Sequence, residues 1–190
     1  MNKEDLVSVI MPTYNAGKYL ADSMNSILNQ TYKNLELLIT DDASTDPTTL
    51  QLLKEYASKD ERVNILYLKE NHGAGFARNK SIERAKGRYI AFCDSDDRWT
   101  TDKLEKQIAF MNKKKCALSC ASYIIFDGET QDEIGFCTAP KKITYGMMKR
   151  DNKVGCLTAI YDVQMLGRKF FMPTIRKRQD WALFLQIVRE

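Results

Sequence analysis

Four short runs of aliphatic and β-branched residues, each followed by polar residues, constrain the fold of this chain more than any other feature. Each run is too short for a helix and has the composition of a buried strand. The stretches between the runs carry apolar residues at helical spacing, as between Tyr19 and Leu28. Alternating strands and helices predict a parallel sheet with both faces covered. The four predicted strands are Val7 to Met11, Leu35 to Thr40, Val63 to Leu68 and Tyr89 to Cys93.

The pattern predicts two further elements before it loosens. A helix from Asp102 to Asn112 precedes a fifth predicted strand from Leu118 to Phe126, so residues 1–125 are predicted to form a doubly wound α/β half. Glycines and prolines interrupt residues 126–190, which we expect to form the other side of a crevice within the same domain. An apolar helical pattern begins at Trp181 and meets no stop signal before Glu190, so we expect a truncated chain.

Composition excludes several classes of protein. With 190 residues, 44% of them hydrophobic and 28% charged, the chain has the balance of one globular domain, not that of a disordered, collagen-like or coiled-coil protein. The longest run without a charge or a strong helix breaker, Cys116 to Phe126, is shorter than the ~20 residues that cross a bilayer. Met1 to Asp5 mixes acidic and basic residues, unlike a signal peptide. A cytoplasmic protein is expected, with association at the inner face of the membrane left open.

Cysteines and net charge argue against three kinds of site. The five cysteines form no Cys-x-x-Cys pair and accompany a single histidine, so neither zinc nor disulfides are expected. A net charge of +4 is too small to indicate a nucleic-acid partner. Short basic groups such as Lys113 to Lys115 are typical of solvated surface, with a phosphate-bearing or membrane partner as the alternative.

The polar residues that follow the four strands are predicted to meet. In an open parallel sheet the carboxyl ends of the strands share one edge, and ligands bind in the crevice there. The sequence therefore predicts one acidic ligand site built from four separate segments. These segments are Pro12 to Asn15, Asp41 to Ser44, Asn71 to Gly73 and Asp94 to Asp97.

Asp94, Ser95 and Asp96 form the most informative of these clusters. Two carboxylates at a strand end can hold Mg²⁺ or Mn²⁺, which complete their coordination with water and substrate phosphates. This chemistry suits a diphosphate ligand. The alternative is structural, because Asp97 or Thr101 can cap the helix that begins near Asp102.

The remaining clusters are less specific by themselves. Asp41 and Asp42 are interpreted as contacts to a nucleotide base or ribose, although turn and cap residues before the next helix have the same composition. Tyr14 can stack on a base or simply pack.

The run Gly73 to Arg78 departs from a dinucleotide fingerprint at Arg78, and it follows the third strand instead of the first. A helix start made of small residues can nevertheless approach a phosphate, and Arg78 can assist. His72 is interpreted as a hydrogen-bonding loop residue.

Taken together, the motifs resemble the inverting, GT-A type glycosyltransferases of family 2, and most closely the bacterial enzymes that build surface polysaccharides or teichuronic-acid-type polymers. The resemblance covers nearly the whole chain. It implies the GT-A fold, which is a Rossmann-like, mostly parallel sheet with helices on both faces and an irregular acceptor-side half. The motifs are Val7 to Asn15, Thr40 to Asp46, Asn71 to Asn79, Phe92 to Trp99 and Lys177 to Trp181.

The resemblance also implies a role for each matching residue. Asp94 would contact the ribose or sugar and share with Asp96 a bound Mn²⁺ or Mg²⁺, and Asp180 would be the catalytic base. Gln179 departs from the family, since many members have Glu there. The nucleotide site would consist of Pro12, Thr13, Tyr14, Asn15, Asp42, Asn71, Gly73, Arg78, Asp94 and Ser95.

The implied activity is metal-dependent transfer of a sugar from a nucleotide donor, expected to be a UDP-sugar, to a hydroxyl of a saccharide or lipid-linked saccharide. Such inverting transfer is a single displacement with no covalent intermediate. Two alternatives remain from the residues alone. One is a phosphatase with an aspartyl nucleophile, because in such enzymes too an Asp-x-Asp motif comes directly after an apolar strand. The other is a nucleotide-binding module without catalysis.

Overall fold

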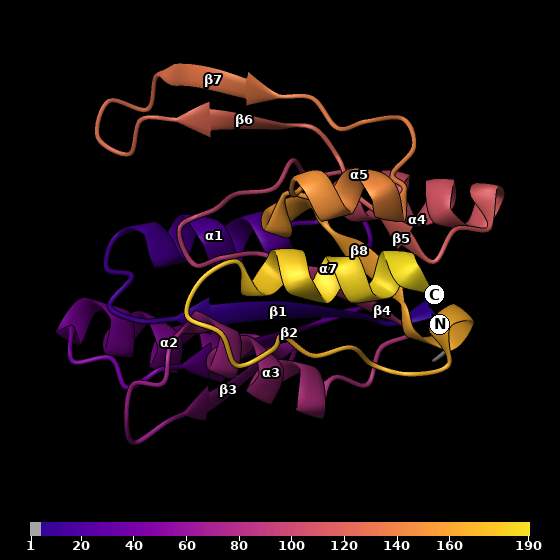
Figure 1. Cartoon of the computed structure of the whole chain (residues 1–190). Helices are drawn as coiled ribbons and strands as arrows, with labels where there is room; N and C mark the ends of the chain where they lie inside the picture. Colours follow the sequence, from indigo (N-terminus) through magenta and orange to yellow (C-terminus); the bar gives the residue numbers. More distant parts are fainter. Residues whose placement is uncertain (1–4) are drawn as a thin grey trace.

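A computed structural model of the chain describes residues 5–190, and its centre is a six-stranded sheet between two layers of helices (Figure 1). Residues 1–4, on which part of the signal-peptide argument rests, lie outside the described residues. The sheet has the order β3-β2-β1-β4-β8-β5. Its strands are β1 (Val7–Thr13), β2 (Leu35–Asp41), β3 (Val63–Tyr67), β4 (Tyr89–Phe92), β5 (Leu118–Ser119) and β8 (Ile160–Asp162).

The four strands predicted first form the parallel part of the sheet. β1 lies at its centre, with Val7 opposite Leu35 of β2 on one side and opposite Tyr89 of β4 on the other. β3 extends the sheet beyond β2 in the same direction. Every residue of β1, β2 and β4 is buried, which explains why their sequences are mostly apolar and do not alternate regularly with exposed polar residues.

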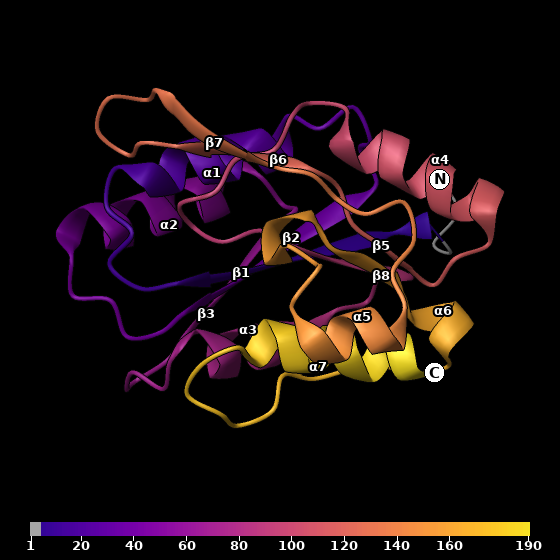
Figure 2. The same ribbon diagram turned by 45° about the horizontal axis from the view of Figure 1, so that its top comes forward.

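Two helical layers cover the sheet, as the turned view shows (Figure 2). The apolar side chains of α1 (Tyr19–Leu28), α2 (Pro47–Lys59) and α4 (Lys103–Lys114) share one core cluster with the sheet. Those of α3 (Ala74–Arg84), α5 (Tyr145–Arg150) and α7 (Gln179–Arg189) share a second cluster on the opposite face. A 3-10 helix, η2 (Cys156–Thr158), and the short α6 (Val163–Leu166) flank β8. The predicted doubly wound, mostly parallel α/β architecture is confirmed.

The predicted fifth strand, Leu118 to Phe126, is wrong. This run divides into β5 and β6 (Tyr123–Phe126), and β6 pairs with β7 (Glu133–Cys137) in a separate hairpin that stands off the central sheet in Figure 1. The position beside β4 belongs to β8, which runs antiparallel to both β4 and β5. An apolar run does not identify its pairing partner, and here it did not identify burial either, since Ile124, Ile125 and Phe126 are exposed. The three residues of β8 are too few to show a period.

The predicted caps have mixed outcomes. The N-cap position of α4 is Asp102, whose side chain makes no capping bond, so neither Asp97 nor Thr101 caps this helix. Asp46 does cap α2, because its carboxylate accepts the backbone N–H of Thr49 at 2.7 Å.

Across residues 5–190, none of the helices combines the length and the apolar character that a membrane span requires.

A buried polar network joins β1, β2 and the turn that leads into β4. Ser8 Oγ donates to Glu36 Oε1 at 2.6 Å, and the backbone N–H of Lys86 donates to the same oxygen at 2.8 Å. Ser8 Oγ also accepts the N–H of Gly87 at 2.8 Å. The turn therefore lies directly on β1, and a side chain at Gly87 would place its Cβ 2.6 Å from the Leu6 carbonyl oxygen.

We predict that Gly87→Ala lowers the free energy of unfolding by about 1–3 kcal/mol, because backbone atoms of β1 cannot move away from the new methyl group. Gly146→Ala is the matched control, since nothing lies within 4 Å of its Cβ position and alanine favours the α5 helix. Urea denaturation of both variants measures the difference. Equal stability of the two variants would mean that the turn accommodates the new methyl group without a loss in the free energy of unfolding.

Candidate active site

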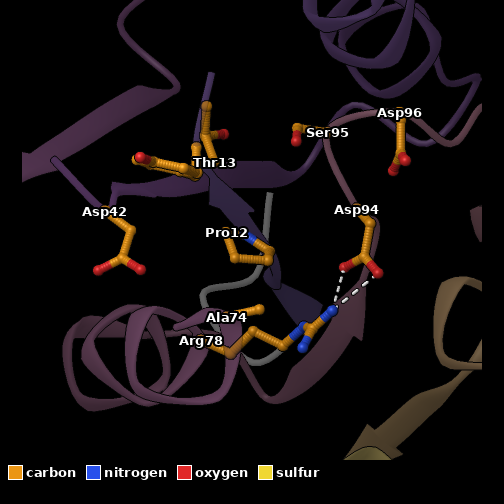
Figure 3. Close-up of a pocket in the computed structure, with 9 residues that line it drawn as sticks. Pro12, Thr13, Asp42, Ala74, Arg78, Asp94, Ser95 and Asp96 are labelled. Carbon is orange, nitrogen blue, oxygen red and sulfur yellow. Dashed lines mark hydrogen bonds and ion pairs between the residues drawn. The ribbon is translucent and has the colours of Figure 1, made fainter. Parts of the chain in front are cut away.

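A pocket of about 190 Å³ opens at the carboxyl ends of β1, β2 and β4 (Figure 3). The start of α3 closes its lower side in this view. Eight of its nine lining residues are among those singled out from the sequence, and Ala74 is the ninth. The lining consists of Pro12, Thr13, Tyr14, Asp42, Ala74, Arg78, Asp94, Ser95 and Asp96.

The end of β1 supplies one wall of the pocket. Thr13 is buried, and within residues 5–190 its hydroxyl has no hydrogen-bond partner. Tyr14 keeps 52% of its surface exposed, so its ring is available for stacking. Asn15 does not line the pocket: its Oδ1 accepts the backbone N–H groups of Thr45 and Asp46 at 2.8 and 2.9 Å and so braces the loop after β2.

Asp42 joins the pocket to the loop before α3. Its two carboxylate oxygens accept the backbone N–H groups of His72 and Gly73 at 2.9 and 2.7 Å. Asn71 Nδ2 donates to the Asp42 carbonyl oxygen at 3.2 Å. Asn71 and Gly73 therefore hold the rim and do not line the pocket. As expected, His72 serves the loop as a hydrogen-bonding residue, although it donates through its backbone.

Arg78 and Asp94 form the electrostatic centre of the site. Arg78 Nη2 lies 2.6 and 2.7 Å from the two carboxylate oxygens of Asp94, and the Arg78 side chain is only 10% exposed. Burial by itself lowers the pKa of Arg78, but Asp94, Cys156 and Asp180 raise it above its ordinary value. The guanidinium therefore remains charged and fixes the orientation of Asp94, as Figure 3 shows.

The carboxylates after Asp94 crowd the same turn. Asp96 is exposed and lines the pocket, while Ser95 is half-buried. Burial, together with the neighbouring Asp94 and Asp96, raises the pKa of Asp97 to about 7, against the opposing effect of Arg78. Within the described part of the chain, no three His, Cys, Asp or Glu side chains form a metal site by themselves. Asp96 is thus the carboxylate most open to a ligand of this pocket.

Asp180 lies close enough to the Arg78 and Asp94 pair to raise the pKa of Arg78, although it does not line the pocket itself. It sits in the first turn of α7, whose N-cap position is Arg178, so Asp180 is not the cap of that helix. Asn152 Nδ2 donates to Asp180 Oδ2 at 3.1 Å. The Asn152 Oδ1 accepts the N–H of Val154 at 3.1 Å, which fixes the amide orientation. Sequence reasoning missed Asn152.

Gln179, the residue that departs from the family pattern, packs over the start of α3. A Cβ at Gly75 would lie 2.5 Å from the Gln179 amide, so the absence of a side chain at Gly75 permits this contact. Trp181 Nε1 donates to the Met148 carbonyl oxygen at 2.6 Å and ties α7 to α5. These two contacts hold Asp180 in place from both sides.

The matching family model is described as glycosyl transferase family 2 and covers residues 8–171. The chain belongs to glycosyltransferase family 2. Membership of the family makes it a glycosyltransferase and decides against the aspartyl phosphatase and the non-catalytic module. The polar segments predicted to meet at the sheet edge all fall within the matched residues.

Curated relatives and a solved structure agree with this family. The chain is 45% identical over its full length to the putative teichuronic acid biosynthesis glycosyltransferase TuaG of Bacillus subtilis, covering 74% of that protein. It is 40% identical over 97% of its length to the Escherichia coli UDP-Glc:alpha-D-GlcNAc-diphosphoundecaprenol beta-1,3-glucosyltransferase WfgD, covering 70% of it. The crystal structure of S. aureus TarS 1-349 in complex with UDP is 25% identical with a TM-score of 0.73, over 93% of this chain and 53% of that one. The GT-A fold is confirmed.

We predict that Arg78→Met lowers the free energy of unfolding by about 1–3 kcal/mol, because it leaves the half-buried Asp94 carboxylate without its cation. Lys80→Met, on the same helix, breaks an exposed ion pair with Glu83 and should change stability by less than about 0.5 kcal/mol. Denaturant titration of the two variants makes the comparison. An Arg78→Met protein as stable as Lys80→Met would show that the pair does not hold the site together.

Proposed function

We propose that the chain is a metal-dependent, inverting glycosyltransferase that moves a sugar from a UDP-sugar to a hydroxyl of a lipid-linked saccharide at the inner face of the cell membrane, in the synthesis of a surface polysaccharide. One observation carries the proposal: Arg78 and Asp94 line a polar pocket at the sheet edge, and Asp180 lies close enough to the same pair to raise the pKa of Arg78. Residues 1–125 would hold the donor. Residues 126–190 would supply the base and the acceptor side of a single domain.

The donor assignment rests on the geometry of the pocket. Tyr14 offers an exposed ring for the uracil, and the fixed Asp42 carboxylate keeps lone pairs for a ring N–H beyond the two backbone donors that it already accepts. The unpartnered hydroxyl of Thr13 faces the same pocket. TarS, which has this fold, was crystallised with UDP.

The side chains at the pocket fit a bound Mn²⁺ or Mg²⁺. Asp96 would hold the ion with one carboxylate, and Asp94, already held by Arg78, would contact the ribose or donor sugar. Such ions take one or two protein carboxylates together with water and phosphate oxygens, so a three-residue protein site is not required. When bound, the metal ion supplies positive charge that stabilises the leaving diphosphate.

Asp180 would remove the proton from the acceptor hydroxyl as that oxygen attacks the anomeric carbon. The carboxylate is held by Asn152 through one oxygen, which leaves the other oxygen for the acceptor. Arg78 keeps Asp94 in place across the reaction without leaving its buried position. General-base assistance of this kind contributes about 10²–10⁴ to the rate.

Metal dependence gives a binding prediction. UDP should bind about tenfold or more tightly with Mn²⁺ than with chelator, because the acidic rim otherwise repels the diphosphate. Asp96→Asn should reduce that ratio to less than about threefold, whereas Asp132→Asn, an exposed carboxylate on the hairpin turn, should leave it unchanged. Calorimetric titration measures each affinity. Equal UDP affinity with and without metal in the parent chain would refute the metal assignment.

The base assignment gives a kinetic prediction. Asp180→Asn should keep UDP affinity within about twofold while sugar transfer falls by about 10²–10⁴. The rate is followed as UDP release in the presence of acceptor. Transfer at the parent rate would exclude Asp180 as the base, and loss of UDP binding would assign it to the shape of the pocket.

Asn152→Ala extends the same test to the residue that orients the base. Transfer should fall about tenfold with UDP affinity unchanged, because the Asp180 carboxylate loses one hydrogen bond and its fixed position. Asn64→Ala is the control, since Asn64 is an exposed residue of β3 on the far edge of the sheet.

A further inference from the structure

A second, larger hollow lies between α4 and the β6–β7 hairpin. Its volume is about 870 Å³, and its walls come from α4, the segment before it, and one side of the hairpin. We call it the α4–hairpin groove. Its apolar walls include Trp99, Phe110, Ile124, Phe126, Phe136 and Leu157. None of the functional residues assigned above lines it.

The groove exposes several large apolar side chains. Phe110, Ile124 and Phe126 are each between 41% and 49% exposed, and Phe136 is 65% exposed. Contiguous exposed apolar side chains with polar residues at their rim are a feature of binding surfaces. The hairpin does not join the central sheet, so these side chains are not needed to complete the core.

Basic side chains stand along one side of the groove. Arg98, Lys103 and Lys106 line it together with Asp102, which forms an ion pair with Lys106, and burial lowers the pKa of Lys103 to about 7. The Lys103 ammonium lies 4.1 Å from the centre of the Trp99 ring and donates to Gln107 Oε1 at 3.0 Å. The Arg98 guanidinium lies 5.4 Å from the centre of the Phe126 ring. Positive charge set directly on aromatic surface suits a ligand with an anionic head and an apolar tail.

An acidic hollow of about 450 Å³ connects this groove to the nucleotide pocket. It shares Asp96 with the nucleotide pocket, and it shares Arg98, Tyr123 and Phe126 with the groove. Carboxylates of Asp22, Asp97 and Asp127 and the rings of Tyr19 and Tyr123 also line it. Carboxylates and aromatic rings bind uncharged sugars through hydroxyl hydrogen bonds and stacking. Carboxylates are therefore concentrated in the hollow beside the donor pocket, and basic and apolar side chains lie together in the groove beyond it.

We propose that the α4–hairpin groove holds the isoprenoid chain and the diphosphate of a lipid-linked acceptor, with the acceptor sugar extending from the acidic hollow beside Asp96 toward Asp180. The inference rests on the proposed function, because it takes the acceptor to be lipid-linked. The hollow beside the donor suits the acceptor sugar, and the groove beyond it offers both the basic and the apolar side chains that the diphosphate and the lipid require. The tail would bind Phe126 and Phe136, and the diphosphate would bind Arg98, Lys103 and Lys106.

Farnesyl diphosphate, a soluble short-chain probe, tests the groove in calorimetric titrations with UDP and Mn²⁺ present at saturation. Phe136→Ser should weaken its binding about tenfold, the loss expected when one large apolar side chain is removed from the contact. Ile134→Ser is the matched control, because Ile134 lies on the same strand with 63% of its surface exposed but does not line the groove. This control should stay within about twofold of the parent.

The head group is tested with a second pair of variants. Lys106→Glu should weaken farnesyl diphosphate about tenfold, while Lys114→Glu, on the same helix but outside the groove, should have little effect. Farnesol and inorganic diphosphate should each bind more weakly than the whole probe. Equal binding of farnesol would overturn the assignment of the cations.

Other results separate the groove from the proposed function. Displacement of the probe by UDP, or equal binding by Phe136→Ser and the parent, would overturn the groove proposal while leaving UDP binding intact. A dimer in light scattering that Phe136→Ser dissociates would also overturn it, by showing a second copy in the groove. Failure of UDP to bind with Mn²⁺, with the probe still bound in the groove, would count against the proposed function alone.

Discussion

The parallel pairing of β1 with strands on both sides is the constraint on which the site depends. All seven residues of β1 are buried, and the pairing continues to its last residue, where Thr13 lies opposite Asp41 of β2. On the other side Ile10 lies opposite Phe92, so the chain leaves β4 beside Pro12. A shift of register in either pair would move Asp42 or Asp94 away from the pocket and turn buried side chains toward water.

The same pairing brings several carboxylates close together after β4, and Arg78 neutralises the charge of one of them. Three carboxylates lie within residues 94–97 after β4, and the pKa of Asp97 is raised first by burial and then by repulsion from Asp94 and Asp96. Arg78 offsets one of these charges from α3, even though its Nε is buried without a hydrogen-bond partner among the described residues. A buried ion pair of this kind contributes little net stability. Its contribution is geometric, because it fixes Asp94 and leaves Asp96 free to line the pocket.

Sequence periodicity was sufficient to predict the four parallel strands and the sheet edge that they share. The strands depend on local composition, and the shared edge follows because parallel strands have their carboxyl ends on the same side of the sheet. Periodicity was insufficient for β8 and for the division between β5 and β6, since pairing partners lie far along the chain. The roles of Asn15 and Asn71 were also hidden, because each side chain bonds to a neighbouring loop instead of facing the pocket. Asn152 belongs to none of the sequence motifs. It lies 28 residues before Asp180 in the sequence, and only the hydrogen bond in the folded chain relates the two residues.

The apolar residues in the second half of the chain fall into two groups, one buried against the sheet and one exposed on the hairpin. Residues of α5, β8 and α7, including Met148, Tyr161 and Phe184, are buried against the sheet and carry Asp180 to the site. The β6–β7 hairpin belongs to neither core cluster and leaves its aromatic and aliphatic side chains in contact with water. Burial of those side chains is not required for the position of Asp180, since α7 is held by Met148 and by the packing of Gln179 on α3. Side chains of the hairpin can therefore be changed without disturbing the packing that positions Asp180.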